Sequence, residues 1–468
     1  MTAQVLLQGK LIGSEEFLLA VPADRDNRLF EARSTWLVLI AEAIPRALLA
    51  ELQLPLLMMG SSGDDRFLVV LPDQTRAEAA DAFLTRVSEA LGKATGGRMR
   101  LVWTSTENLG DWTIIRKRLQ DSMHAGVQPR VADPSFFQPF TGAGAGPDVI
   151  PRNLREATSI GWSFDFPALI AAEESSLKWT VGADMEIPVT RHAARNGEAL
   201  ATTKELARRS KGMKLWGVLR GEIDDFAMRM RRAQSVEEHV VLSTLYKQFL
   251  ANEIQLLCSQ GDYFQRLTLL WSGGAGFAVY GAWDALIGFA RELQHVFANF
   301  AADQLRDLPG GEAKTITMAL TIAEPGASLA RTWEDCGRDL EIARATDKDC
   351  LYILGRVLEW KQVADAAELK DAVVHLNEEF RGGRQFLTQL RNLYRKVESS
   401  EQTDDERLTA RALRFQRRFA RVASRKEREF QKLRSHLMKE MAGRNLRGKL
   451  KLRPEGLIAL EWARLAED

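Results

Sequence analysis

The chain has 468 residues, of which 45% are hydrophobic and 27% are charged, and its formal net charge is only +1. These are ordinary values for a folded protein of several domains, and they argue against disordered and fibrous classes. Apolar runs such as Trp36–Ile40 meet a charged residue well before the roughly 20 residues that a bilayer requires, so we expect no membrane span.

The N-terminus and the cysteines both bear on the cellular compartment. The first residues lack the basic start and the long apolar stretch of a secretory signal, which predicts a cytoplasmic protein. Cys258, Cys336 and Cys350 form no CxxC pair, so we expect neither a disulfide framework nor a thiolate zinc site.

The first 105 residues show alternating strand and helix patterns around a turn-rich segment, Gly60–Asp65. The order that they predict is β-α-β-turn-β-α-β, which is typical of a ferredoxin-like unit. The predicted strands are Val5–Gly9, Leu54–Met59, Phe67–Leu71 and Met99–Thr104, and the predicted helices are Ala32–Leu52 and Thr75–Leu91.

The same order returns about 210 residues later, which indicates a duplicated unit. Its hairpin turn, Ser272–Gly276, keeps nearly the same offset from the first strand as the turn of the first copy. The predicted elements are a strand at Lys214–Ile223, a helix at Val236–Cys258, hairpin arms at Arg266–Trp271 and Phe277–Tyr280, a helix at Trp283–Phe300 and a strand at Thr315–Ile322.

A Gly- and Pro-rich passage, Gln138–Pro151, separates the two copies, and helical patterns alone follow residue 363. The predicted fold class is α+β, with two ferredoxin-like domains followed by an all-α helical domain. The predicted boundaries are 1–125 for the first domain, 126–185 for a linker or insertion, 186–362 for the second domain and 363–468 for the helical domain.

The turn Ser272-Gly273-Gly274-Ala275-Gly276 has a plain structural explanation, because paired glycines supply the positive φ angles of tight hairpins. A functional interpretation comes from palm domains, where acidic residues at this turn and on the neighbouring strand hold two divalent metal ions. The turn alone does not decide between the two.

The stretch SGGAGFAVYGAWDALIGFARELQ resembles the large subunit of type III CRISPR effector complexes, whose second palm domain carries SGGDD at this turn. Upstream, ATTKELARRSKGMKLWGVLRGEIDDF is similar to the family's approach to the first palm strand. Downstream, DLEIARATDKDCLYILGRVLEW is similar to its final strand. The first copy, through EARSTWLVLIAEAIPRALLAELQLP and RFLVVLP, is similar to the family's first palm domain. The resemblance therefore implies two palm domains over most of residues 1–365.

The chain departs from the family pattern where the metal ligands belong. Ala275 and Gly276 stand where the family has two aspartates, so the resemblance implies that cyclic-oligoadenylate synthesis is lost. Glu222 and Asp224 alternate onto one face of the neighbouring strand and Asp225 faces the other side. We interpret these three residues, with Gly273, Gly274, Ala275 and Gly276, as a vestigial site with no catalytic residue, no bound metal and no cofactor beyond a possible weak Mg²⁺ or ATP.

Two further family features are missing from the sequence. The chain begins at the first palm domain and contains no His-Asp dipeptide, so we expect no nuclease domain. No cysteine occurs in residues 105–160, so the zinc insertion between the palms is also lost. Asp64 and Asp65 could in principle replace the missing pair, but the adjacent strand offers no carboxylate, which favours a solvated turn.

Charge is unevenly distributed along the chain. Residues 407–453 hold 17 Lys or Arg against three Glu, a net +14, and since the whole chain is +1 the remainder carries −13. Basic residues form one continuous helical stripe because they recur at alternating steps of four and three. The stripe is Arg407, Arg411, Arg414, Arg418, Arg421, Arg425, Arg428 and Lys432.

Like charges in this stripe repel one another along the helix, which favours an external anion. We expect the stripe to bind the backbone of guide or target RNA, or of DNA, with an acidic protein partner and simple solvation as the alternatives. An apolar seam that includes Phe415, Phe419 and Leu437 runs beside it and should pack on the preceding helices.

The sequence thus predicts a non-enzymatic large subunit that helps to assemble an RNA-guided antiviral complex. Its expected partners are guide RNA, target RNA and effector subunits of the backbone, guide-end-capping and small helical types. The first alternative is residual nucleotidyl transfer or ATP binding through Glu222 and Asp224. The second alternative is a nucleotide-binding regulatory protein unrelated to CRISPR.

Overall fold

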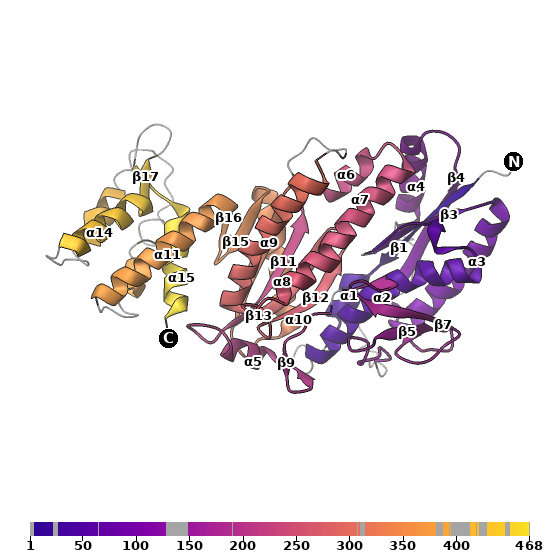
Figure 1. The fold of residues 1–468 in the computed structure, drawn as a ribbon, viewed down its shortest axis with the longest axis horizontal. Helices are drawn as coiled ribbons and strands as arrows, with labels where there is room; N and C mark the ends of the chain where they lie inside the picture. Colours follow the sequence, from indigo (N-terminus) through magenta and orange to yellow (C-terminus); the bar gives the residue numbers. More distant parts are fainter. Residues whose placement is uncertain are drawn as a thin grey trace, which may run out of the picture.

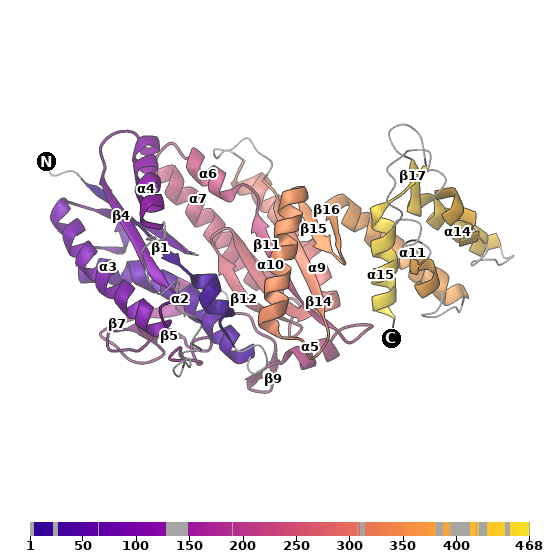
Figure 2. The same cartoon turned by 180° about the vertical axis from the view of Figure 1, so that it is seen from behind.

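The computed structural model arranges the chain as three bodies along its longest axis: a first palm domain, a second palm domain and a C-terminal helical region (Figures 1 and 2). No helix in the part of the chain that the structure describes is long and apolar enough to cross a membrane. The described residues are 4–21, 27–63, 65–127, 148–189, 191–306, 308, 314–380, 387–392, 394, 412–417, 419–420, 428–444 and 450–467.

The first palm domain is a four-stranded antiparallel sheet in the order β2-β3-β1-β4, which is a ferredoxin-like arrangement. Asp73 begins its second long helix by accepting a hydrogen bond from the Arg76 backbone N–H at 2.8 Å. The elements are β1 (Val5–Ile12), α1 (Ser14–Leu19), α2 (Asn27–Glu51), β2 (Met59–Gly63), β3 (Arg66–Leu71), α3 (Gln74–Ala94), β4 (Arg100–Glu107) and α4 (Trp112–Val127).

One predicted strand of this domain is wrong. Leu54–Met59 was expected to be extended, but Leu56–Met58 forms a 3₁₀ turn, η1, and the strand β2 starts only at Met59. Pro55 has its φ fixed at −69° and supplies no N–H to a sheet, and the side chain of Leu57 is 90% exposed. The helices α1 and α4 were not predicted.

The segment between the palms is a small folded sheet in the order β6-β5-β7-β8. Its apolar side chains, including Ile160 and Val181, are buried in the same core as α2 and α3. The Trp36 indole N–H donates to the Ala168 carbonyl at 3.0 Å. Packing against the first palm therefore stiffens this cysteine-free insertion. The strands are β5 (Ser159–Trp162), β6 (Ile170–Ala171), β7 (Leu177–Gly182) and β8 (Ile187–Pro188).

The approach to the second palm contains a two-stranded sheet and a short helix with a reciprocal capping box. The Thr202 hydroxyl accepts from the Glu205 N–H, and the Glu205 carboxylate accepts from the Thr202 N–H. These elements are β9 (Arg195–Asn196), β10 (Ala199–Leu200) and α5 (Thr203–Arg208).

The second palm domain is a six-stranded sheet in the order β12-β13-β11-β14-β15-β16. The predicted helix Val236–Cys258 is formed, with a π turn at its centre. The elements are β11 (Trp216–Ile223), α6 (Phe226–Arg232), α7 (Val236–Gln248), η3 (Phe249–Glu253), α8 (Ile254–Cys258), β12 (Leu267–Gly273), β13 (Gly276–Ala282), α9 (Trp283–Gln304), β14 (Ile316–Ala323), α10 (Leu329–Thr346), β15 (Cys350–Ile353) and β16 (Arg356–Glu359).

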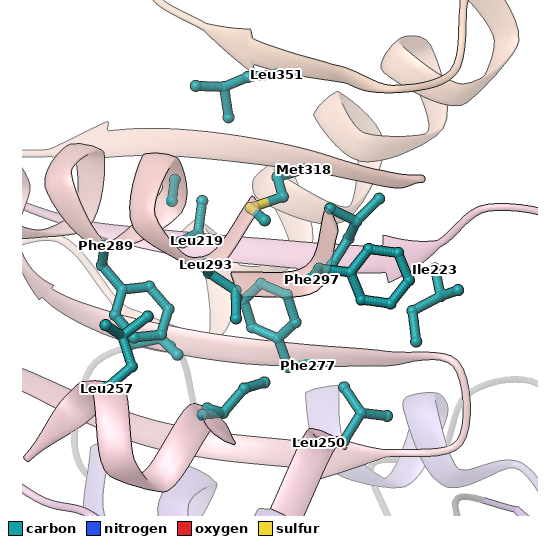
Figure 3. Packing of buried hydrophobic residues seen from close by; sticks show 14 of the residues in the cluster. Leu219, Ile223, Leu250, Leu257, Phe277, Phe289, Leu293, Phe297, Met318 and Leu351 are labelled. Carbon is teal, nitrogen blue, oxygen red and sulfur yellow. The ribbon is translucent and has the colours of Figure 1, made fainter. Parts of the chain in front are cut away.

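Alternation along β11 places successive side chains in different cores. Leu219 and Ile223 join Phe277 and Phe297 in the main cluster, which α9 covers (Figure 3). Val218 lies on the other face, in a second cluster with residues of α10. The sheet is therefore buried on both faces, which leaves only its strand ends and edges for chemistry.

The C-terminal region is mainly helical but not entirely so, because a two-stranded sheet follows its basic helix. This hairpin was not expected, although the α+β fold class is confirmed. Helix α15 joins the region to the second palm: Ile458 and Trp462 pack in the palm core, whereas Leu460 packs among the C-terminal helices. The elements are α11 (Trp360–Phe380), α14 (Arg428–Met441), β17 (Ala442–Arg444), β18 (Leu450–Leu452) and α15 (Pro454–Ala466).

The shared core of the insertion and the first palm predicts that Ile160→Ala lowers the free energy of unfolding by about 3 kcal/mol, because Ile160 is fully buried. The urea midpoint of the full chain measures this loss. Leu57→Ala is the matched control, and since Leu57 is 90% exposed its effect should stay within about 0.5 kcal/mol. Equal midpoints for the two variants would contradict a shared core.

Candidate functional site at the palm turn

The glycine-rich hairpin turn is held firmly against the neighbouring strand. Gly274 adopts φ 58°, a left-handed conformation that a glycine accommodates without strain. The Ala275 carbonyl accepts from the Ile223 N–H at 2.7 Å, and the Ser272 hydroxyl donates to the Leu250 carbonyl at 2.7 Å. The turn is therefore tied both to β11 and to the π turn η3.

Gly276 has no space for a side chain. A Cβ atom at this position would lie 2.5 Å from the backbone carbonyl oxygen of Gly221 and 3.2 Å from the Trp271 ring. Because real Cβ atoms do not approach backbone atoms so closely, a carboxylate at position 276 requires the strands to move apart. Ala275, in contrast, is only half-buried.

Asp224 is buried, and its carboxylate is occupied by hydrogen-bond donors of the chain. Thr317 donates to Oδ1 at 2.8 Å, and Thr315 donates to Oδ2 at 2.7 Å. The Asp349 backbone N–H donates to Oδ2 at 3.1 Å. Asp224 thus fastens the end of β11 to the start of β14 and to the turn before β15, which is a structural role.

Glu222 and Asp225 are each paired with a cation at or just beyond the C-terminal end of α10. Glu222 meets Arg344 at 2.5 Å, and Asp225 meets Lys348 at 2.7 Å. Burial raises the pKa of Glu222, and the Arg344 guanidinium acts in the opposite direction. Arg344 and Lys348 thus neutralise two of the three acids that we predicted as a vestigial site.

The predicted split of these acids between two faces of the strand is wrong. Strand β11 ends at Ile223, so its alternation does not extend to the two aspartates. Asp225 has a left-handed backbone, φ 55°, that turns its carboxylate toward Lys348. All three acids therefore contact the segment that runs from Arg344 to Asp349.

A hollow of about 510 Å³ adjoins this cluster. Within the described part of the chain, no group of three or more His, Cys, Asp or Glu side chains is placed to hold a metal ion. The hollow is lined by Glu222, Asp224, Asp225, Arg231, Arg344 and Lys348, together with apolar side chains of α6 and α10.

The turn of the first palm meets the turn of the second. A Cβ atom on Gly63 would lie 3.9 Å from the Gly274 nitrogen and 3.8 Å from a carboxylate oxygen of Glu42. Of the two first-palm aspartates, Asp64 lies outside the described residues. Asp65 pairs with Lys10 of the neighbouring strand β1 at 3.2 Å, so it serves as an ion-pair partner within its own domain.

A buried ion-pair network centred on Glu42 crosses the interface beside these turns. Lys247 of the second palm donates to the Glu42 carboxylate at 2.7 Å and to the Ser62 hydroxyl at 3.0 Å. Arg46 donates to the same carboxylate at 2.6 Å. Burial opposes the charge, but Lys247 and Arg46 together lower the pKa of Glu42 to about 2. One carboxylate therefore links α2, β2 and α7.

A second hollow of about 470 Å³ opens beside this network, between the two palms. Arg46, Ser62, Lys247 and Asn252 line it. The cations on its wall are already engaged by Glu42, so the hollow offers hydroxyl and amide groups more than free positive charge.

The sequence did not identify Arg344, Lys348, Glu42 or Lys247 as site residues. The stretch DLEIARATDKDC contains the first two, but only the three-dimensional fold brings them to Glu222 and Asp225. A run of two cations near a helix end is the only sequence signal, and it is weak because cations are common there.

Only part of the basic stripe falls within the described residues. Arg414 is exposed and lies in the helical segment 412–417, Lys432 is exposed on α14, and Arg428 begins α14. The other stripe residues, Arg407, Arg411, Arg418, Arg421 and Arg425, lie outside the described residues, so the continuity of the stripe stays a prediction.

The apolar seam beside the stripe is confirmed where it is described. Phe415, Phe419 and Leu437 are fully buried in the C-terminal core. The rings of Phe415 and Tyr394 meet edge to face with centroids 5.3 Å apart. This apolar seam therefore anchors the basic helices, and the exposed side chains of Arg414 and Lys432 face solvent.

Together, these features define a protein with two palm-like domains, the second of which has no acidic side chain in its hairpin turn. The family model of the Cas10/Cmr2 second palm domain matches residues 215–352, so this part of the chain resembles that domain. The predicted resemblance to the large subunit of type III CRISPR effector complexes is confirmed.

Solved structures of Csm1 share the fold of the whole chain. The Csm1–Csm4 subcomplex in the type III-A CRISPR-Csm interference complex gives a TM-score of 0.76 at 14% identity, over 100% of this chain and 70% of that chain. Csm1 in T. onnurineus gives 0.71 at 14% identity, over 99% and 69%. The Csm1–Csm4 cassette in complex with AMPPNP gives 0.74 at 15% identity, over 100% and 70%. No curated protein sequence matches the chain.

The low pKa of Glu42 predicts an acid-labile contact between the palms. A carboxyl with a pKa of about 2 in the folded protein and about 4.5 when unfolded stabilises fully above pH 4.5, and this stabilisation is lost as the pH falls toward 2. We expect Glu42→Gln to cost about 3 kcal/mol at pH 7, because Arg46 and Lys247 lose their shared partner. Urea midpoints between pH 7 and pH 3 measure both effects.

Glu334→Gln is the control, since Glu334 is half exposed and stands 4.0 Å from Arg338. It should change the stability by less than about 0.5 kcal/mol. If Glu42→Gln left both the midpoint and its acid dependence unchanged, the ion-pair network would not hold the palms together.

Proposed function

We propose that this chain is a catalytically silent large subunit of a type III-like CRISPR effector complex, with a role in assembly and in binding guide and target RNA. The observation that carries the proposal is the state of the palm carboxylates. Asp224 is occupied by three donors, and Glu222 and Asp225 are paired with Arg344 and Lys348. None of them is presented to a metal.

The residues present do not fit the two metal ions that a palm domain uses. Such a pair needs several carboxylate oxygens facing one another, and the turn contributes none because it carries Ala275 and Gly276. A divalent ion would also have to displace the threonine hydroxyls and the lysine and arginine side chains that already satisfy the acids. We therefore derive no chemical step through a metal.

The related solved structures support an assembly role. Csm1 has been solved together with Csm4 as a cassette and as a subcomplex of the interference complex. We infer that this chain binds a subunit of the Csm4 type, along with other backbone and small helical subunits, in the cytoplasm. An antiviral role follows from the proposed complex.

RNA binding is proposed for the basic C-terminal helices. Arg414 and Lys432 are exposed, and the buried side chains of Phe415 and Leu437 fix these helices from the opposite side. Cations held on a rigid apolar seam are arranged to contact phosphates without reading bases. Guide and target RNA would supply the sequence specificity through their own pairing.

Residual ATP binding is the second candidate function. The hollow of about 510 Å³ lies against Glu222 and Asp224, and the related Csm1–Csm4 cassette has been solved with AMPPNP. The hollow therefore offers room for a nucleotide, but the three acids nearest the turn are already engaged by hydrogen bonds or ion pairs, so we expect no turnover.

The assembled complex, incubated with ATP, Mg²⁺ or Mn²⁺ and target RNA, should form no linear or cyclic oligoadenylate. Nucleotide analysis by mass spectrometry measures this outcome, with a complex that retains the SGGDD turn as the positive control. Product that forms, and that disappears in an Asp224→Asn variant, would falsify catalytic silence.

Replacing the turn should not restore activity. Ala275→Asp with Gly276→Asp should yield a less stable protein without nucleotide turnover, because the Cβ at 276 would contact the Gly221 carbonyl. Ala275→Asp alone should fold normally, since Ala275 is half-buried with access to solvent.

For the basic helices, we expect Arg414→Glu with Lys432→Glu to weaken binding of single-stranded RNA and to reduce the salt slope of the affinity by about 1.4, or about 0.7 per lost phosphate contact. Fluorescence anisotropy of the full chain at several salt concentrations measures both quantities. Lys93→Glu, on an exposed residue of α3, should change neither. An unaltered slope in the double variant would show that these helices do not contact RNA.

A further inference from the structure

A second cationic surface lies where helix α4 of the first palm meets helix α6 of the second palm. Figures 1 and 2 show the two helices side by side at one edge of the molecule. Because each helix comes from a different palm, the surface exists only while the two domains are joined. We call it the seam and define it by three cations, the half-buried Arg116 and the exposed Lys117 and Arg231.

Arg116 fixes the two helices relative to each other. Its guanidinium donates to the Ala233 carbonyl at 3.0 Å and to the Met230 carbonyl at 3.5 Å, both at the C-terminal end of α6. The last carbonyl groups of a helix accept no hydrogen bond from within that helix, so a cation is favourable there. Arg116 is thus an anchor that sets the position of the exposed cations around it.

Two cations of the seam, Arg116 and Arg231, are close enough to repel each other. Burial is the main cause that lowers the pKa of Arg116, and the charge of Arg231 lowers it further. Among the described residues, no carboxylate forms an ion pair with Arg116, Lys117 or Arg231. Arg231 also lines the hollow at the palm turn, where Arg344 and Lys348, unlike Arg231, are paired with acids.

A surface that brings like charges together across a domain boundary, with no ion pair to a carboxylate among the described residues, is suited to an external polyanion. We infer that the seam binds the phosphodiester backbone of a nucleic acid. No exposed Phe, Tyr or Trp ring lies on the described faces of α4 or α6, because Trp112 is buried and Phe226 is half-buried. The contact therefore rests on phosphates more than on base stacking, and it is independent of sequence.

This inference is separate from the basic C-terminal helices, because it rests on other residues at a distant part of the chain. It adds a contact that involves both palms. The affinity of a strand for the seam would therefore depend on whether the two palms are docked. It also fits the proposed scaffold role, since a backbone contact does not require the palm carboxylates.

The test uses the full chain with Lys117→Glu and Arg231→Glu, which leave the anchor Arg116 in place. The probes are a labelled 30-nucleotide uridine RNA and a duplex RNA hairpin, each titrated at several salt concentrations. We expect the salt slope for the single strand to fall by about 1.4, or about 0.7 for each lost phosphate contact. Lys93→Glu is the matched control, and it should bind as the unmodified chain does.

Combination with the Arg414→Glu and Lys432→Glu variant separates the two surfaces. Losses that add in the combined variant support two independent contacts. If the C-terminal variant alone abolishes binding of both probes, or if the seam variant binds both probes with an unaltered slope, the seam is not a nucleic-acid surface. Loss of a co-purifying acidic subunit without any change in RNA affinity would assign the seam to a protein partner and overturn the inference.

Discussion

The free-energy cost of removing a carboxylate from water governs the centre of this molecule. An unpaired buried carboxylate costs several kcal/mol, so each one must find donors or a counterion. A metal-binding palm meets this demand with divalent ions. Here the chain meets it from within, through Thr315, Thr317 and the Asp349 backbone for Asp224, and through Lys348 for Asp225. A centre satisfied in this way gains little from a metal.

The same constraint joins the two palms. Glu42 is buried at the interface and accepts hydrogen bonds from three side chains. Arg46 and Ser62 belong to the same domain as Glu42, whereas Lys247 belongs to the other palm. Apolar packing alone does not fix the relative orientation of two surfaces as closely as a charged hydrogen bond does. The network thus holds the two hairpin turns against each other, beside the hollow of about 470 Å³ between the palms.

Periodicity predicted the fold well because each core strand has to alternate. The strands at Phe67–Leu71 and Phe277–Tyr280 were predicted within a few residues of their ends for this reason. The strand predicted at Leu54–Met59 was wrong because Pro55 and a locally exposed leucine pair override an apolar run. Ion pairs between distant residues could not be predicted from the sequence. Lys247 and Glu42 are 205 residues apart, and no repeating pattern indicates that they form a contact.

Charge segregation within a nearly neutral chain bears on the scaffold role that we propose. Beside the palm turn, Arg344 and Lys348 are paired with Glu222 and Asp225, so these two cations are not free to bind an outside anion. Among the described residues of the seam, by contrast, Arg116, Lys117 and Arg231 form no ion pair with a carboxylate, and bound phosphates would offset the repulsion between Arg116 and Arg231. The proposed scaffold role therefore rests on what the joined palms present, which is a surface that neither palm has by itself.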